Sequence, residues 1–182
     1  AVESAIALCD APSEIAPPAT FAQRRTGLKR FVPRLDLADV LRAHPNIPVL
    51  VSGTSWSLDE DFSVLLDAIE RYDATADEAS LPPLVVVITG RGPLRAEFEQ
   101  RVAGLRLMHL HLRTAWLSEP DYRLLLAAAD LGLSFHRSAS GVDLAMKVAD
   151  MQGAGLPVCA LDYGPCLGEQ IQHGVNGMVF HD

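Results

Sequence analysis

From residue 46 to residue 182, short apolar runs alternate along the chain with amphipathic segments. Runs such as PVLVSG, LVVVITG and LPVCAL are bounded by Gly or Pro, and most are followed by a segment whose apolar positions recur every three or four residues. Continuous apolar strands joined by helical crossovers are typical of a parallel sheet that is buried on both faces. The pattern therefore predicts an α/β domain over residues 46–182, a Rossmann-like parallel sheet with helices on both faces.

Residues 1–45 lack this alternation. Prolines interrupt the segment and prevent any long helix: Pro12, Pro17, Pro18 and Pro33. A helical stretch is suggested only near residues 35–43. We expect residues 1–45 to be an irregular linker or the remnant of an interdomain region. The chain does not begin with Met, and we expect it to be an excised or incomplete piece of a longer protein.

Composition excludes several classes of function. The 182 residues are 49% hydrophobic, which is enough to bury a substantial core. The net charge is −8 and the 15 Lys and Arg residues are scattered, which argues against binding to nucleic acid or to an anionic membrane surface. No apolar run approaches the roughly 18 residues that a membrane-spanning helix needs. Three cysteines form neither a disulfide framework nor a paired zinc motif, which favours a reducing compartment.

Ligands of such sheets bind at the carboxyl ends of the strands, so the loops that follow the strands hold the candidate chemistry. The first loop, SGTSWSLDEDF, contains Gly53, Thr54, Ser55 and Trp56. An indole at this end of a sheet either stacks on a base or sugar or packs into the core, and both interpretations of Trp56 stay open. The spacing of Ser57 and Glu60 predicts a capping box at the start of the next helix.

The second loop, TGRGPLR, contains Gly90, Arg91 and Gly92. Two glycines allow the backbone to approach a phosphate closely, and Gly92 followed by Pro93 is a good helix start. The third glycine of a dinucleotide-binding fingerprint would fall at Arg95, so the G-x-G-x-x-G pattern fails. This argues against a dehydrogenase-like domain that binds NAD.

The third loop and helix, SASGVDLAMKVADMQGAGLP, place charges beside a glycine-rich turn. A helix that starts near Val142 would bury Leu144, Val148 and Met151 on one face. Its neighbouring face would carry a charged stripe at the same spacing: Asp143, Lys147 and Asp150.

This stripe has two interpretations. It is either a solvated, salt-bridged face or one side of a nucleotide site. In the second case Ser138, Ser140 and Gly141 would leave the first N–H groups of the helix open to a diphosphate. Lys147 would lie beside the phosphates, and a carboxylate would reach the ribose hydroxyls.

Histidines add one candidate. His136 ends the LGLSF strand on the ligand side, where it contacts a sugar or phosphate or makes a structural hydrogen bond. His109 and His111 alternate on one strand face, but no third ligand is identifiable, so strand packing is favoured and no metal site is predicted. Cys159 lies in an apolar strand and is assigned to the core.

These segments resemble a known family. GTSWSLDEDFSVLLDAIE, VVVITGRGPLR, SGVDLAMKVADMQGAGLPVCAL and HGVNGMVF closely resemble the chitobiosyldiphosphodolichol β-mannosyltransferases, GT-B glycosyltransferases of the endoplasmic reticulum. The resemblance covers about residues 48–182. It implies transfer of mannose from GDP-mannose to dolichyl-diphosphate-linked chitobiose, with inversion to a β-1,4 linkage, during N-glycan precursor assembly on the cytosolic face of the membrane.

Within that family this chain looks like the C-terminal, donor-binding half. The resemblance implies that Lys147 follows the donor phosphates and that Asp150 takes the place of the ribose-binding acid. The residues expected to form the donor site are Gly53, Thr54, Ser55, Trp56, Gly90, Arg91, Gly92, His136, Ser138, Ser140, Gly141, Asp143, Met146, Lys147 and Asp150. No cofactor and no metal are expected.

The departures from the family pattern bear on activity. Thr54, Ser55 and Trp56 stand where many GT-B donor domains carry a basic pair, and Ala145 replaces a common proline. An acceptor domain and a membrane anchor are not recognised, and no residue can be assigned as the general base that inversion requires. We therefore expect the isolated chain to be inactive. A non-catalytic nucleotide-binding or regulatory module is the alternative, and the sequence upstream of Ala1 would separate the two.

Overall fold

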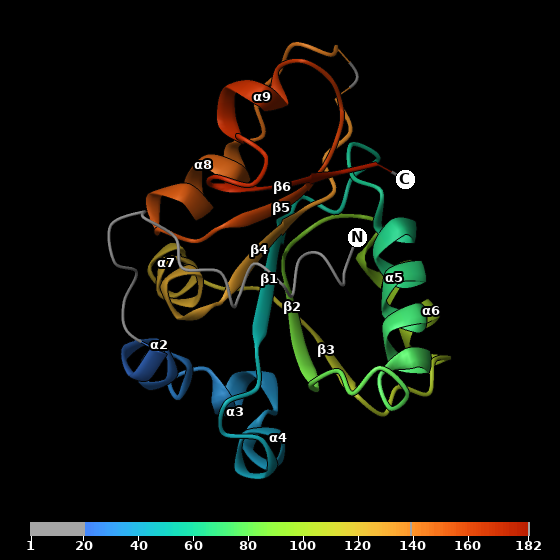
Figure 1. Cartoon of the computed structure of the whole chain (residues 1–182), viewed down its shortest axis with the longest axis vertical. Coiled ribbons are helices and arrows are strands. Elements are labelled where there is room, and N and C mark those ends of the chain that lie inside the picture. Colours follow the sequence, from blue (N-terminus) through green and yellow to red (C-terminus); the bar gives the residue numbers. More distant parts are fainter. Residues whose placement is uncertain (1–20, 139, 182) are drawn as a thin grey trace.

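The computed structural model describes residues 21–138 and 140–181. Its centre is a six-stranded parallel sheet with the strand order β3-β2-β1-β4-β5-β6 (Figure 1). The strands are β1 (Val49–Thr54), β2 (Leu84–Gly90), β3 (Leu110–Ala115), β4 (Leu131–Ser134), β5 (Val158–Leu161) and β6 (Gly177–Phe180). The predicted Rossmann-like parallel sheet is confirmed.

The central strands are apolar throughout because both of their faces are covered. Val49 and Val51 of β1 point into one core cluster, whereas Leu50 between them points into the other. Every residue of β2 is buried. This is the arrangement expected of a parallel sheet enclosed between two helical layers.

Helices cover both faces of the sheet, with α5 (Phe62–Thr75) and α6 (Arg95–Ala103) on one side and α7 (Glu119–Ala128), α8 (Met146–Gly153) and α9 (Leu167–Gln170) on the other (Figure 1). The core beneath α5 and α6 contains Leu66 and Phe98. The opposite core receives side chains from α7, α8 and α9. Helices on both faces are thus confirmed.

Residues 21–45 form the short helices α2 (Phe21–Leu28), α3 (Val32–Leu35) and α4 (Ala38–Ala43). The expectation of an irregular segment is therefore wrong for α2 and α3, whereas the helical stretch expected near residues 35–43 is confirmed by α4. Leu28, Phe31 and Leu37 are completely buried in the same core as α7 and α8. Pro33 does not interrupt this structure because it lies in the first turn of α3, where no intrahelical N–H is needed. Pro12, Pro17 and Pro18 lie outside the described residues.

Helix α8 begins later than the sequence pattern indicates. Its first residue is Met146, and Val142 and Leu144 precede it with 75% and 44% of their surface exposed. Leu144 is therefore not a core residue, whereas Val148 and Met151 are completely buried as expected. The delay arises because the backbone before the helix is extended at Ala145, its N-cap.

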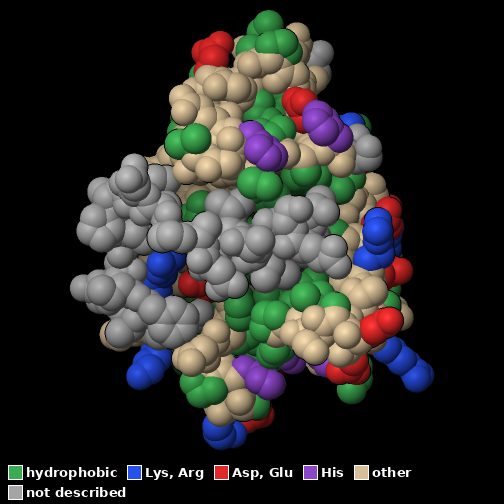
Figure 2. Space-filling model, in the orientation of Figure 1, with side chains coloured by type: hydrophobic (Ala, Val, Ile, Leu, Met, Phe, Trp, Pro, Cys, Tyr) green, Lys and Arg blue, Asp and Glu red, His purple; other side chains and the backbone are tan. Residues whose placement is uncertain are grey.

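Two observations bear on possible partners. In the part of the chain that the structure describes, no helix has both the length and the apolar character that crossing a membrane requires. On the face seen in Figure 2, the visible Lys and Arg side chains lie apart around the edge and do not gather into one patch.

The order of the strands places a crevice at one end of the sheet. From β1 the chain proceeds outward through β2 to β3, then returns to the other side of β1 and continues through β4, β5 and β6. β1 and β4 are therefore neighbours, and the helices that follow them, α5 and α8, lie on opposite faces of the sheet. Such a switch point is where open parallel sheets bind their ligands.

Candidate functional site

A cleft of about 650 Å³ occupies this switch point. It is bounded by the loops after β1, β2, β3 and β4 and by the first turns of α7 and α8. Its lining residues are Gly53, Thr54, Ser55, Asp59, Glu60, Thr89, Gly90, Trp116, Leu117, Ser118, Glu119, Tyr122, His136, Leu144, Ala145, Met146, Lys147 and Asp150. Carboxylates, one ammonium group and an imidazole thus meet at the carboxyl end of the sheet.

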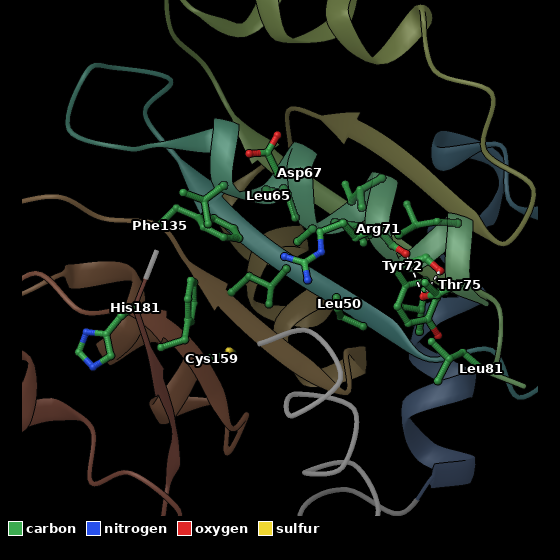
Figure 3. A pocket seen from close by; sticks show the side chains of 18 residues that line it. Leu50, Leu65, Asp67, Arg71, Tyr72, Thr75, Leu81, Phe135, Cys159 and His181 are labelled. Atoms are coloured by element: carbon green, nitrogen blue, oxygen red, sulfur yellow. Dashed lines mark hydrogen bonds between the residues drawn. The ribbon is translucent and has the colours of Figure 1, made fainter. Parts of the chain in front are cut away.

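A second cavity of about 380 Å³ lies between α5 and the sheet (Figure 3). Leu50, Phe135 and Cys159 contribute apolar walls. The hydroxyl of Tyr72 donates a hydrogen bond to the carbonyl oxygen of Pro82 at 2.5 Å. Burial raises the pKa of the Cys159 thiol to about 11, as its predicted core position requires. The larger cleft, which lies at the carboxyl ends of the strands and contains Glu60 and Lys147, is therefore the candidate site.

Glu60 is the acid at the floor of the cleft, and its side chain is only 2% exposed. Its carboxylate accepts hydrogen bonds from the Thr54 hydroxyl and from the backbone N–H of Ser55. The capping box predicted for this residue is wrong. The N-cap of α5 is Asp61, which accepts the backbone N–H of Ser63 at 3.0 Å and leaves Glu60 free to turn inward.

Lys147 forms an ion pair with Glu60 from the opposite side of the cleft. Burial lowers the pKa of Lys147 to about 8, and the nearby carboxylate of Asp59 opposes this shift. The lysine side chain is 15% exposed and lines the cleft. An ammonium group has three donors, so it can hold Glu60 and still donate to an anion in the cleft.

Backbone hydrogen bonds join the two loops that carry this ion pair. The N–H of Asp61 donates to the carbonyl of Phe135 at 3.1 Å, and the N–H of Arg137 donates to the carbonyl of Asp59 at 2.7 Å. The Arg137 guanidinium also forms an ion pair with Asp61 at 3.1 Å. The loops after β1 and β4 are therefore tied together across the switch point.

His136 and Asp143 form a second polar cluster beside the cleft. Nε2 of His136 lies 2.7 Å from Oδ2 of Asp143, and the other carboxylate oxygen accepts the hydroxyls of Ser138 and Ser140. Hydrogen bonds from Ser138, Ser140 and His136 hold the pKa of Asp143 well below its ordinary value. Asp143 thus organises the loop before α8 and does not share a helical stripe with Lys147.

The N-terminus of α8 faces the cleft without a side-chain cap. Gln170 fixes the preceding residue, since its side-chain amide both accepts from the N–H of Ala145 at 3.1 Å and donates to its carbonyl at 3.2 Å. One turn into the helix, Asp150 is exposed to the cleft near Tyr122. Burial, with the charge of Asp150, raises the pKa of Tyr122 to about 12.

The glycines of the β2–α6 loop are required by the neighbouring loop. A Cβ on Gly90 would overlap the carbonyl oxygen of Thr54, and one on Gly92 would overlap that of Ser55. The space that a side chain would occupy at both positions is taken by backbone atoms of the loop after β1. Glycine is therefore required by this packing and not by the close approach of a phosphate. Arg91 between them places its guanidinium 4.3 Å from the centre of the Trp116 ring.

Trp56 packs in the core and does not present its ring to a ligand. It is 1% exposed, and its ring centre lies 4.9 Å from that of Phe62 and 5.1 Å from that of Phe98. The open question from the sequence is settled in favour of packing. The exposed indole of the site belongs instead to Trp116, which follows β3 and was not among the predicted residues.

The cleft gathers about half of the predicted donor-site residues. Those that line it are Gly53, Thr54, Ser55, Gly90, His136, Met146, Lys147 and Asp150. Those that do not are Trp56, Arg91, Gly92, Ser138, Ser140, Gly141 and Asp143. The main residues missed are Glu60 and Trp116. Trp116 follows β3, and ligands bind at the carboxyl ends of parallel strands, so its position in the sequence was a usable signal. Glu60 was missed because Ser57 and Glu60 together have the spacing of a helix capping box.

No group of three or more His, Cys, Asp or Glu side chains within residues 21–138 and 140–181 is arranged to hold a metal ion. The polar groups of the cleft include the buried Glu60–Lys147 ion pair, the uncapped N-terminus of α8 and the carboxylate of Asp150.

Comparison with known proteins identifies the relatives of this chain. The chitobiosyldiphosphodolichol β-mannosyltransferase of Mus musculus is 51% identical over 144 residues, which are 79% of this chain and 30% of the relative. The protein of the same name from Arthroderma benhamiae is 42% identical over 179 residues, 95% of this chain and 40% of the relative. The chain is a homologue of these β-mannosyltransferases. It matches their C-terminal part and spans about a third of their length. No protein-family model matches it.

Solved structures show the same fold. The catalytic domain of starch synthase IV from Arabidopsis thaliana, bound to ADP and acarbose, aligns with a TM-score of 0.61 at 16% identity and covers 89% of this chain and 32% of that one. The C-terminal domain of a glycosyl transferase group 1 protein from Francisella tularensis aligns at 0.53 with 16% identity, covering 94% and 80%. This chain thus shares the fold of these two glycosyltransferase domains.

Proposed function

We propose that this chain is the donor-binding domain of a mannosyltransferase that uses GDP-mannose. The complete enzyme would transfer mannose to dolichyl-diphosphate-linked chitobiose, with inversion, at the cytosolic face of the endoplasmic reticulum. The acceptor would be held by a part of the enzyme outside this chain. The observation that carries the proposal is the cleft at the β1–β4 switch point, where Lys147, Asp150 and the uncapped start of α8 face one space.

The chemistry of the cleft suits a nucleoside diphosphate sugar. The N–H groups at the start of α8 and the Lys147 ammonium would stabilise the negative charge of the diphosphate. That charge grows on the leaving group as the sugar is transferred, so the same contacts would favour the transition state. Asp150 lies one turn further along α8, where a carboxylate would accept hydrogen bonds from ribose hydroxyls. His136 would contact the donor at the end of β4.

Titration calorimetry tests this proposal directly. The chain is titrated with GDP, UDP and NAD, each with and without EDTA. We expect GDP to bind, UDP to bind more weakly, NAD not to bind, and EDTA to leave the GDP affinity nearly unchanged. Absence of GDP binding by a folded chain would reject the proposal. Binding without transfer by the complete enzyme would favour the alternative of a non-catalytic nucleotide-binding module.

The GDP affinity is expected to fall as the pH rises from 7 to 9. Lys147 of the free chain has a pKa of about 8, so it is mostly charged at pH 7 and mostly neutral at pH 9. A diphosphate binds the charged form, and the neutral form must first take up a proton, which weakens binding roughly tenfold over this range. Calorimetry at each pH measures the change. The control is Lys147→Arg, provided that this variant still binds GDP, because arginine stays charged over this pH range. If its GDP affinity fell as steeply with pH, the titration would belong to another group.

Replacing Asp150 by asparagine should weaken GDP much more than inorganic pyrophosphate. Asp150 is expected to contact the ribose, which pyrophosphate lacks. Loss of the Lys147 ammonium should instead weaken the binding of both ligands, because both carry phosphates. We expect a loss for GDP of about 10-fold, the value of a charge-assisted hydrogen bond. Competition titrations provide both affinities. Equal losses for the two ligands would show that Asp150 has a general structural role.

The isolated 182-residue chain is expected to bind GDP-mannose without transferring mannose. Most of the rate advantage of such an enzyme comes from holding the acceptor hydroxyl and a base against the sugar, and no described residue is assigned to that task. The chain is incubated with GDP-mannose and a lipid-linked chitobiose analogue, alone and with the N-terminal part of a relative added. Turnover by the chain alone would contradict this expectation.

A further inference from the structure

Gln170 makes a two-point contact with the residue that precedes α8. Its side-chain oxygen accepts a hydrogen bond from the N–H of Ala145 at 3.1 Å, and its side-chain nitrogen donates to the carbonyl of the same residue at 3.2 Å. The reversed orientation of the amide would set donor against donor and acceptor against acceptor. The two hydrogen bonds therefore fix the side chain of Gln170 and the backbone of Ala145 relative to each other.

Gln170 is itself held from two sides. The side-chain nitrogen of Gln152, on α8, donates to the backbone carbonyl of Gln170 at 2.5 Å, and that of Asn176 donates to the same oxygen at 2.9 Å. Gln170 ends α9 and lies 25 residues beyond Ala145 in the sequence. These contacts tie α9 to the start of α8, so the position of Ala145 depends on a partner outside its own loop.

Ala145 needs such a partner because it is buried. The residue is 3% exposed and packs in the core with Val148. A buried N–H without a partner is costly, and the backbone would shift to recover a hydrogen bond. Ala145 is also the N-cap of α8, and its carbonyl accepts the N–H of Val148 at 2.9 Å. The backbone of Ala145 thus sets the direction of the first turn of α8.

We propose that Gln170 is a positioning residue for donor binding: through Ala145 it aims the first N–H groups of α8 at the diphosphate. This inference rests on the proposed function. The first N–H groups of a helix have no partner within it, and α8 has no side-chain cap, so the residue before the helix controls their direction. Without Gln170 only a fraction of the free molecules would have the binding geometry, and the apparent affinity would fall by that fraction.

Gln170→Met removes both hydrogen bonds and keeps an unbranched side chain of similar length. We expect GDP to bind about 3- to 10-fold more weakly, the equivalent of one hydrogen bond. Inorganic pyrophosphate should lose the same factor, since the affected N–H groups face the phosphates. Calorimetry measures both affinities. Gln172→Met is the matched control, because Gln172 is exposed and bonds to Asn176 through its backbone N–H. Undiminished GDP affinity in folded Gln170→Met would overturn the proposal.

Proline at position 145 provides a rescue that a general structural role of Gln170 would not predict. Proline has no N–H and fixes φ near −65°, close to the −70° of Ala145. In the native chain its ring would overlap the side-chain oxygen of Gln170, so Ala145→Pro alone should weaken GDP binding. In Ala145→Pro/Gln170→Met that oxygen is gone and no N–H lacks a partner. The double variant should bind GDP within about twofold of the native chain. A double variant no better than Gln170→Met would overturn the proposal.

Hydrogen exchange separates this inference from the function on which it rests. The N–H of Val148 donates to the carbonyl that Gln170 holds, so its exchange in the ligand-free chain should be faster in Gln170→Met and return toward the native rate in the double variant. If GDP does not bind the native chain, the proposed function fails and the role of Gln170 in binding falls with it. If GDP binds but exchange at Val148 does not respond to Gln170→Met, only the positioning role is rejected.

Discussion

Replacing Lys147 by methionine is expected to lower the free energy of unfolding by about 3–5 kcal/mol. The variant leaves the carboxylate of Glu60 buried, with only the Thr54 hydroxyl and the Ser55 N–H as partners. Glu60→Leu should lower the free energy of unfolding by less than Lys147→Met does. The remaining Lys147 is more exposed than Glu60 and can lose its proton at a pKa of about 8. Urea unfolding measures both variants. Lys147→Met should also weaken GDP by roughly 10- to 150-fold, through the lost charge-assisted contact.

The double variant Glu60→Leu/Lys147→Met decides whether these losses come from the pair. Replacing both members of a buried ion pair by apolar residues is often close to neutral, so the double variant should be clearly more stable than Lys147→Met alone. Glu70→Leu, which changes an exposed acid on α5, is the matched control and should have little effect. Simple addition of the two single losses would show that Glu60 and Lys147 stabilise the fold independently.

Gly92→Ala is expected to cost about 3 kcal/mol of stability. The new Cβ would overlap the Ser55 carbonyl oxygen and lie 2.7 Å from the Cβ of Trp56. Because the obstacle is backbone, relief requires the β2–α6 loop to move away from the loop after β1. That movement would distort the floor of the cleft, so GDP affinity should fall together with stability.

Gly168→Ala is the control for this substitution. A Cβ at Gly168 meets no heavy atom within 4 Å, and alanine is the better helix former in α9. Its unfolding midpoint in urea should be unchanged or slightly higher than that of the native chain. Equal midpoints for Gly92→Ala and Gly168→Ala would mean that the two loops can separate without cost.

The sheet could be predicted from the sequence because its signal is local. Each buried strand is a continuous apolar run, and β2 shows this most clearly because neither of its faces reaches solvent. Helices α2 and α3 were missed for the opposite reason. α2 has little apolar character along its length, and it packs against α7 with Leu28 buried in the core.

The candidate site was predicted in part, and the failures share a physical cause. Lys147 and Asp150 were found because they follow a glycine-rich turn at the ligand end of a strand. Glu60 was assigned to a helix cap because Ser57 stands three residues before it, yet its strongest partner, Lys147, is distant in the sequence. Asp143 was placed on α8, but the hydroxyls of Ser138 and Ser140 hold it in the loop before the helix. Side-chain hydrogen bonds of this kind compete with helix formation.

The backbone hydrogen bonds between the loops after β1 and β4 have a consequence for the energetics of recognition. The Asp61 to Phe135 and Arg137 to Asp59 bonds fix both walls of the cleft before any ligand arrives. A cleft ordered in advance loses little conformational entropy on binding, so more of the contact energy is retained as affinity. Association should then be fast and show a single phase, because no slow rearrangement of these walls limits it.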